Sequence, residues 1–231
     1  MRLALPAGRR HHAYRSHLCD INGASIALVQ MGLGRSSARE AVGWAIESLE
    51  PRQVIVIGTA GSLRSEFRLG DIFLPVSVVS TTGELRDVAP IRIAGGTFTS
   101  PQQPRLEGPT RLIESPVVVS TAEAKSELHR TMNADAVDME SFTVVDVCNQ
   151  LGLSVSVVRF ISDTLEHYFP PEIPLLLNPQ GNPRYFRILT AILRRPKLYS
   201  ELRELQRDSK VSSDAITAWT TSFRQALETN R

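Results

Sequence analysis

Runs of apolar, largely β-branched residues recur along the chain and alternate with stretches of helical spacing. The apolar runs predict strands at residues 26–29, 54–57, 72–79, 117–119 and 155–161. Because each run is apolar at consecutive positions, we expect its strand to be covered on both faces of a sheet.

Helical spacing connects several of these runs. Residues 36–49 predict a helix with a serine cap and Pro51 just past its end, and residues 122–132 predict a second helix. A third is predicted at residues 141–151, where Gly152 stops it. Strands that alternate with helices favour an α/β fold with a largely parallel sheet.

Two stretches depart from this alternation. Residues 81–116 are rich in Gly, Pro and Thr, which predicts long loops with short strands over one end of the sheet. Turn signals at 170–171 and 178–181 precede a basic, mostly helical stretch at 185–227. We expect a single domain over residues 1–231, with a helical C-terminal extension from about residue 184.

The composition argues against several classes of protein. A formal net charge of +2, from 26 basic and 24 acidic residues, argues against a nucleic-acid partner and favours a small-molecule substrate. The two cysteines, Cys19 and Cys148, lie far apart, so neither a disulfide framework nor a zinc site is indicated, and a cytoplasmic location is expected. No apolar run reaches the roughly 18 residues that a membrane-spanning helix needs.

Carboxylates stand where two predicted elements begin or end. Glu140 opens the helix predicted at 141–151, and Asp163 follows the strand predicted at 155–161. Such positions can converge on one cleft at the carboxyl ends of neighbouring strands, which is where open α/β sheets bind ligands. The alternatives are structural: Glu140 would stabilise the helix dipole by about 0.3–1 kcal/mol, and Ser162 or Asp163 would cap the next segment.

Two loops of small residues follow predicted strands. In the first, at 58–62, backbone amides and the Thr59 hydroxyl can approach a ligand, although a tight turn would need the same glycines. In the second, Gly32, Gly34 and Arg35 precede a helix and can hold an anion. Ser37 stands where a dinucleotide-binding fingerprint has its third glycine, which argues against a dinucleotide-dependent oxidoreductase.

Four short motifs in this order resemble the superfamily of nucleoside phosphorylases and methylthioadenosine/adenosylhomocysteine nucleosidases. They are Gly58-Thr59-Ala60-Gly61-Ser62-Leu63, Leu69-Gly70-Asp71-Ile72, Asp138-Met139-Glu140-Ser141 and Arg159-Phe160-Ile161-Ser162-Asp163. The resemblance covers residues 24–164 and implies a three-layer α/β/α sandwich around a central mixed, largely parallel sheet. It also implies cleavage of the bond between a base and ribose, in a homo-oligomer.

The resemblance assigns catalysis to Asp163 and Glu140. Asp163 matches the acid that meets the purine N7, and Glu140 matches the residue that holds the ribose 2′ and 3′ hydroxyls, with Met139 packed against the sugar. As the sugar approaches an oxocarbenium ion the leaving purine needs a proton, and general acid help of this kind is typically worth about 10²–10⁴ in rate.

The resemblance also supplies the remaining candidate site residues. The substrate-binding set is completed by Asp138, Thr59, Ala60, Gly61, Ser162 and Phe160. The phosphate-binding set is Gly32, Gly34, Arg35 and Thr59. No metal or organic cofactor is expected, and inorganic phosphate is the expected co-substrate.

The chain departs from the family pattern in two places. Nucleosidases of the family have acidic residues after the first strand, one of which activates water, but residues 7–10 here are Ala-Gly-Arg-Arg. This favours phosphorolysis over hydrolysis, since phosphate carries its own nucleophilic oxygen. Residues 120–125 also offer small or charged side chains, Lys125 among them, where nucleosidases stack an aromatic ring on adenine.

Several alternatives stay open. Together with the Pro-rich basic tail, the departures resemble a branch associated with hopanoid synthesis, whose substrate would be adenosylhopane. In that case the C-terminal helices could contact a membrane, although packing on their own domain is the favoured interpretation. A non-catalytic nucleoside-binding protein is the alternative from another class. Trp44 and Trp219 are candidate contacts of a homo-oligomer.

Overall fold

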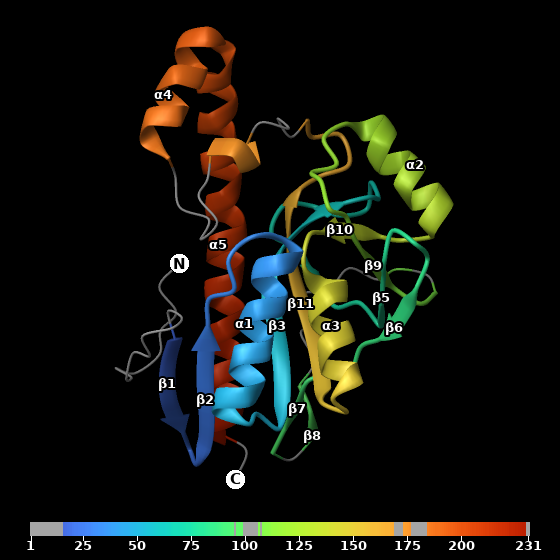
Figure 1. The fold of residues 1–231 in the computed structure, drawn as a ribbon, viewed down its shortest axis with the longest axis vertical. Coiled ribbons are helices and arrows are strands. Elements are labelled where there is room, and N and C mark those ends of the chain that lie inside the picture. The colour runs from blue at the N-terminus through green and yellow to red at the C-terminus, as the bar shows by residue number, and fades with distance from the viewer. Residues whose placement is uncertain are drawn as a thin grey trace.

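A mixed seven-stranded sheet forms the centre of the computed structural model, which describes residues 16–94, 96–98, 106, 108–168, 173–176 and 184–229 (Figure 1). The strand order is β4 (Ile72–Phe73), β11 (Ser154–Asp163), β3 (Gln53–Ser62), β10 (Ala136–Asp138), β9 (Arg111–Glu114), β5 (Ser77–Val79) and β6 (Leu85–Asp87). The pairs β11–β3, β10–β9 and β5–β9 are parallel, whereas β10–β3, β11–β4 and β5–β6 are antiparallel.

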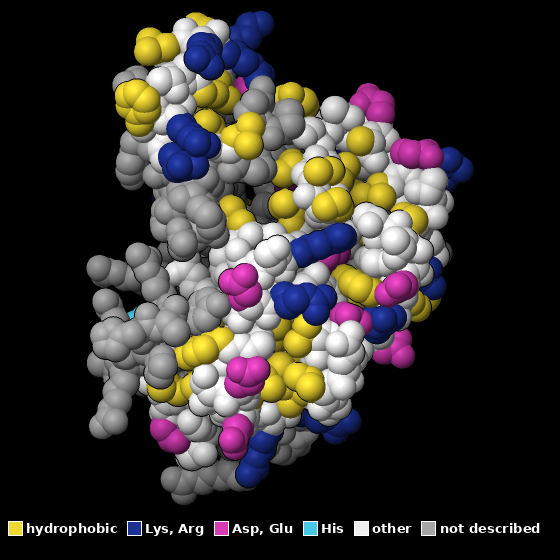
Figure 2. Space-filling view, in the orientation of Figure 1, with side chains coloured by type: hydrophobic (Ala, Val, Ile, Leu, Met, Phe, Trp, Pro, Cys, Tyr) yellow, Lys and Arg dark blue, Asp and Glu magenta, His cyan; other side chains and the backbone are white. Residues whose placement is uncertain are grey.

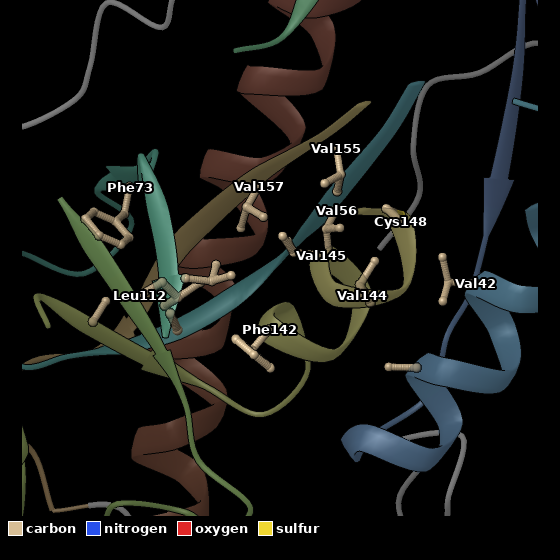
Figure 3. Close-up of a cluster of buried hydrophobic side chains, with 14 of the residues drawn as sticks. Val42, Val56, Phe73, Leu112, Phe142, Val144, Val145, Cys148, Val155 and Val157 are labelled. Atoms are coloured by element: carbon tan, nitrogen blue, oxygen red, sulfur yellow. The ribbon is translucent and has the colours of Figure 1, made fainter. Parts of the chain in front are cut away.

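Helices cover both faces of the sheet (Figure 1). Helices α1 (Gly34–Leu49) and α3 (Ser141–Gln150) pack on one face, where Val42, Val144 and Val145 meet the strand residues Val56 and Val157 (Figure 3). The long helix α5 (Lys197–Thr229) covers the other face. The expected three-layer α/β/α sandwich around a mixed sheet is confirmed.

The remaining helices lie toward one end of the sheet (Figure 1). Helix α2 (Ala122–Met132) packs Leu128 and Met132 beside Leu63 of the segment after β3, and its bounds match the prediction. The short 3₁₀ helix η1 (Ile173–Leu176) leads toward α4 (Tyr185–Arg194), which contacts both η1 and α5. None of the helices in the described residues is both long and apolar enough to cross a membrane.

Two hairpins lie outside the central sheet. Within the part of the chain that the structure describes, β1 (Ser16–Ile21) and β2 (Ala24–Val29) pair with each other and with no other strand, and the same holds for β7 (Arg92–Ile93) and β8 (Gly96–Thr97). The prediction that residues 26–29 join the main sheet was therefore wrong. The turn between β1 and β2 explains the difference, because Asn22 and Gly23 both adopt positive φ, 54° and 83°, as a tight hairpin turn requires.

Two predicted strands were also misplaced. Residues 117–119 form no strand, and Val117 is 65% exposed instead of being buried in the sheet. The strand of this region is β9, in which Leu112 and Ile113 are fully buried. The run at 72–79 is divided at Pro75 into β4 and β5, which pair with different neighbours. The residues 7–10 that lack the family's carboxylate, and the turns predicted at 170–171 and 178–181, lie outside the described residues.

Candidate active site

Gly61 of β3 lies between the two acidic motifs. It pairs with Asp163 of β11 on one side and with Val137 of β10 on the other. Neighbouring strands are about 4.8 Å apart, so the backbones of β11 and β10 are separated by roughly 10 Å here, which suits a ligand of nucleoside size. The expected reason for this convergence was wrong, because β10 runs antiparallel to β3 and the motifs do not share one carboxyl edge.

The glycines of the 58–62 motif allow side chains of β11 to lie against β3. These residues do not form the predicted loop but continue β3, paired with β11 as far as Gly61. A Cβ atom on Gly58 would lie 1.9 Å from Nη1 of Arg159, and one on Gly61 would lie 2.7 Å from Oδ2 of Asp163. The glycines are thus needed for close approach inside a strand rather than for a turn.

Asp163 is buried and both of its carboxylate oxygens accept hydrogen bonds. The hydroxyl of Ser162 donates to Oδ1 at 2.9 Å, and Nζ of Lys125 donates to Oδ2 at 2.6 Å. The candidate acid is therefore held in one orientation beside Gly61.

Lys125 is a partner of Asp163 that the sequence reasoning missed. The lysine is fully buried, and its ammonium group also donates to the carbonyls of Thr164 at 2.6 Å and His167 at 3.3 Å. A signal was present in the sequence, because Lys125 shares the inward face of α2 with Leu128 and Met132 at the spacing i, i+3, i+7. A lysine on an apolar face needs a buried partner, since an unpaired buried charge is costly.

Asp138 organises the start of α3. Its carboxylate forms an ion pair with the buried Arg159 and accepts from the Ser141 amide at 3.2 Å, while Arg159 also donates to the Ser141 hydroxyl at 2.7 Å. These contacts give Asp138 a structural role, and its contact with substrate stays a prediction. Through the helix start, this pair fixes the position of Glu140.

Glu140 occupies the N-cap position of α3 and reaches across to the start of α1. Its Oε1 accepts from the Gly34 amide at 2.7 Å. Burial, and then the nearby charge of Asp138, raise the pKa of Glu140 above its ordinary value, against the opposing effect of Arg159. A half-buried carboxylate with a perturbed pKa is typical of a functional site.

The candidate phosphate loop is bound to the protein's own carboxylates. Gly32 and Gly34 have φ of 88° and 80°, and Arg35 forms an ion pair with the fully buried Glu114. Glu114 in turn accepts from the amide and hydroxyl of Thr143, at 2.7 and 2.9 Å. The Gly34 amide and the Arg35 guanidinium, both expected to meet phosphate, are therefore engaged within the protein.

The other predicted site residues divide into three groups. Thr59 is exposed on β3 and Met139 is half-buried between Asp138 and Glu140, so both remain candidates. Ala60 is buried in the core. Phe160 does not lie at the site, because it is fully buried on the α5 face of the sheet with Trp219, its ring 6.4 Å away.

Replacing Glu140 with glutamine should stabilise the fold at neutral pH. A carboxyl group whose pKa is raised by folding holds its proton more tightly in the folded than in the unfolded protein, so stability falls as pH rises from the ordinary pKa through the raised one. Glu140→Gln removes this loss and keeps an oxygen for the Gly34 amide. Urea unfolding should therefore show a gain in the free energy of unfolding at pH 7 that shrinks toward pH 4.

Glu47→Gln, at an exposed position of α1, is the matched control and should show no such pH-dependent gain. A Glu140→Gln protein that is less stable than the parent at pH 7 would contradict the stated effect of burial on Glu140.

Within the described residues, no group of three or more His, Cys, Asp or Glu side chains is placed to hold a metal ion. A reaction without a metal or organic cofactor therefore remains a prediction. The candidate site consists of carboxylates, their cationic partners and glycine backbone.

Comparison with known proteins agrees with this geometry. The family profile described as "Phosphorylase superfamily" matches residues 2–102 and 84–194. The chain belongs to this superfamily. The recognition made from the four motifs is thereby confirmed, and the superfamily and its nucleosidase relatives indicate an enzyme of the nucleosidase or nucleoside phosphorylase type.

Individual relatives are distant. The chain is 24% identical over 187 residues to a 5'-methylthioadenosine/S-adenosylhomocysteine nucleosidase of Buchnera aphidicola, covering 74% of this chain and 70% of the relative. It is 27% identical over 164 residues to the enzyme of the same name from Actinobacillus succinogenes, covering 62% and 70%.

Solved structures share the fold. A putative methylthioadenosine nucleosidase of Weissella paramesenteroides superposes with a TM-score of 0.53 at 21% identity, covering 70% of this chain and 79% of that one. The futalosine hydrolase of Helicobacter pylori gives 0.53 at 18% identity, covering 68% and 75%.

Proposed function

We propose that the protein cleaves the N-glycosidic bond of a purine nucleoside and releases the base. The observation that carries this proposal is the placement of two strands on opposite sides of Gly61: β11, which ends at Asp163, and β10, which leads to Glu140 at the start of α3. Asp163 would protonate the leaving purine, and Glu140 would accept hydrogen bonds from the ribose hydroxyls, with Met139 against the sugar. Ser162 would keep the Asp163 carboxylate aimed at the base.

The charges at the site favour water over phosphate as the nucleophile that accepts the ribosyl group. Asp138, Glu114 and Glu140 bring three carboxylates to the region of the 32–35 loop, against the two guanidinium groups of Arg35 and Arg159. An added phosphate dianion would enter net negative surroundings, where a neutral water molecule meets no such repulsion. The names of the relatives, which are nucleosidases, point the same way.

Phosphate remains the alternative acceptor, as the sequence favoured. Phosphate as the nucleophile is supported by the positive φ angles of Gly32 and Gly34 in the loop. It is also supported by Arg35, whose side chain is 41% exposed in the first turn of α1. Arg35 could exchange Glu114 for phosphate without leaving the helix start, where anions are favoured.

We further propose an adenosine derivative with a modified 5′ position as the substrate. The relatives are named for 5'-methylthioadenosine and S-adenosylhomocysteine. Adenosylhopane stays the more specific alternative suggested by the sequence. A homo-oligomer in the cytoplasm is part of the same proposal, although Trp219 belongs to the core rather than to an exposed contact.

A substrate panel with and without phosphate tests this proposal. The full chain is incubated with adenosine, inosine, 5'-methylthioadenosine, S-adenosylhomocysteine and adenosylhopane, and the released base and sugar are identified. We expect free ribose or a 5′-modified ribose, formed at the same rate with and without phosphate. A ribose 1-phosphate product would instead establish phosphorolysis.

A non-catalytic nucleoside-binding protein is the alternative from another class. It is favoured by one observation, namely that the candidate acid Asp163 already forms an ion pair with Lys125. Tight binding of a nucleoside without release of any base, in either buffer, would support this alternative and overturn the proposed reaction.

A further inference from the structure

Helix α4 and the first turn of α5 form an end of the molecule that extends beyond the sheet (Figure 1). We call residues 184–199 the α4 tip. Large apolar side chains are exposed on it: Phe186 is 80% exposed, Leu193 74% and Tyr199 56%. Phe186 and Leu193 are seven residues apart in α4, so they project from the same side of the helix. The expectation that this helix would bury its apolar side on its own domain is not met at these positions.

The α4 tip is also strongly basic. It contains Arg184, Arg187, Arg194, Arg195 and Lys197 and no acidic residue. The first acidic residue after it is Glu201, which pairs with Arg195. Figure 2 shows Lys and Arg side chains next to hydrophobic ones over this end. The whole protein carries a net charge of only +2, so this concentration of positive charge is local.

A basic, amphipathic helix with exposed aromatic and leucine side chains fits the surface of a lipid bilayer. Apolar side chains enter the boundary between headgroups and acyl chains, while Arg and Lys meet anionic headgroups. A second copy of the chain is a poor occupant, because a symmetric contact would place the same basic residues against each other.

We infer that the α4 tip docks on an anionic membrane surface. This inference rests on the exposed side chains and charges of the tip and does not depend on the proposed reaction. Helix α5 begins in the tip and packs on β11, the strand that ends at Asp163, where the Ser212 hydroxyl donates to the Ile161 carbonyl at 2.9 Å. Docking of the tip would therefore attach to the bilayer a helix that is packed on the strand of the candidate acid.

Vesicle binding tests the inference. The full chain is sedimented with phosphatidylcholine vesicles, with and without about 30% phosphatidylglycerol, in low salt, where surface charges are weakly screened. We expect binding that requires the anionic lipid. Phe186→Ser/Leu193→Ser and, separately, Arg187→Gln/Arg194→Gln should each lower the partition coefficient by at least about tenfold.

A matched control distinguishes docking through the α4 tip from nonspecific hydrophobic adsorption to the vesicles. Val76 and Leu151 are 51% and 63% exposed on the body of the protein, so Val76→Ser/Leu151→Ser removes similar apolar surface elsewhere. This control should bind like the parent, and circular dichroism should show that all three variants are folded.

Two results would overturn the inference. One is a parent protein that stays in the supernatant with anionic vesicles in low salt. The other is a change of oligomeric state, measured by light scattering, in Phe186→Ser/Leu193→Ser but not in the control, because the tip would then be a contact between copies of the chain.

Discussion

Asp163→Asn should lower the rate of base release by about 10²–10⁴. The amide has the size of the carboxylate, and its oxygen can still accept from Lys125 or Ser162, so the shape of the site should persist in the folded protein, although the uncompensated Lys125 charge should lower its stability. It cannot deliver a proton to the leaving purine. The measurement is kcat and KM for the best substrate of the panel, and we expect the loss in kcat with little change in KM.

The leaving group provides the control for this prediction. When a 4-nitrophenyl riboside is cleaved, 4-nitrophenolate departs as a stable anion that needs little protonation, so Asp163→Asn should cleave this substrate at nearly the parent rate. Ser162→Ala, which removes the hydroxyl bonded to Oδ1 of Asp163, should have a smaller effect on the nucleoside. An equal loss of Asp163→Asn activity on both substrates would show that Asp163 does not act as a general acid.

Elements with strong periodicity could be predicted from the sequence. The bounds of α2 were correct, and α1 and α3 were each predicted within two residues at either end, because their apolar faces repeat over several turns. The short strand β10, of three residues, was missed, since three residues carry no usable periodicity. Its antiparallel pairing with β3 nevertheless decides on which side of β3, opposite the strand of Asp163, the segment with Asp138 and Glu140 begins.

The site was predicted less completely than the fold, for a physical reason. Motifs identify which residues matter, but they do not show which buried partner neutralises each charge. Arg159 was recognised only as part of a motif, although its pairing with Asp138 sets the start of α3. In the same way, Arg35 was expected to meet phosphate, while the fold places the carboxylate of Glu114 beside it. Such pairings depend on strand order, which the local sequence does not encode.

Lys125→Met should cost about 3–5 kcal/mol in the free energy of unfolding. Lys125 is fully buried and Asp163 nearly so, and removing one partner of a buried ion pair leaves the other charge without compensation. The carbonyls of Thr164 and His167 would lose their donor as well. Urea unfolding measures the loss. Lys210→Met, at an exposed position of α5, is the matched control and should change stability by less than about 0.5 kcal/mol.

The double variant Lys125→Met/Asp163→Asn distinguishes a lost charge pair from a lost packing contact. If the uncompensated carboxylate is the main cost, replacing it by a neutral amide should recover part of the loss, so the double variant should be more stable than Lys125→Met alone. If the two losses simply add, the lysine acts through its hydrocarbon chain and its carbonyl contacts instead. Because Asp163→Asn also carries the activity prediction, the same set of variants shows whether the pair that stabilises the fold is the one that holds the acid in place for catalysis.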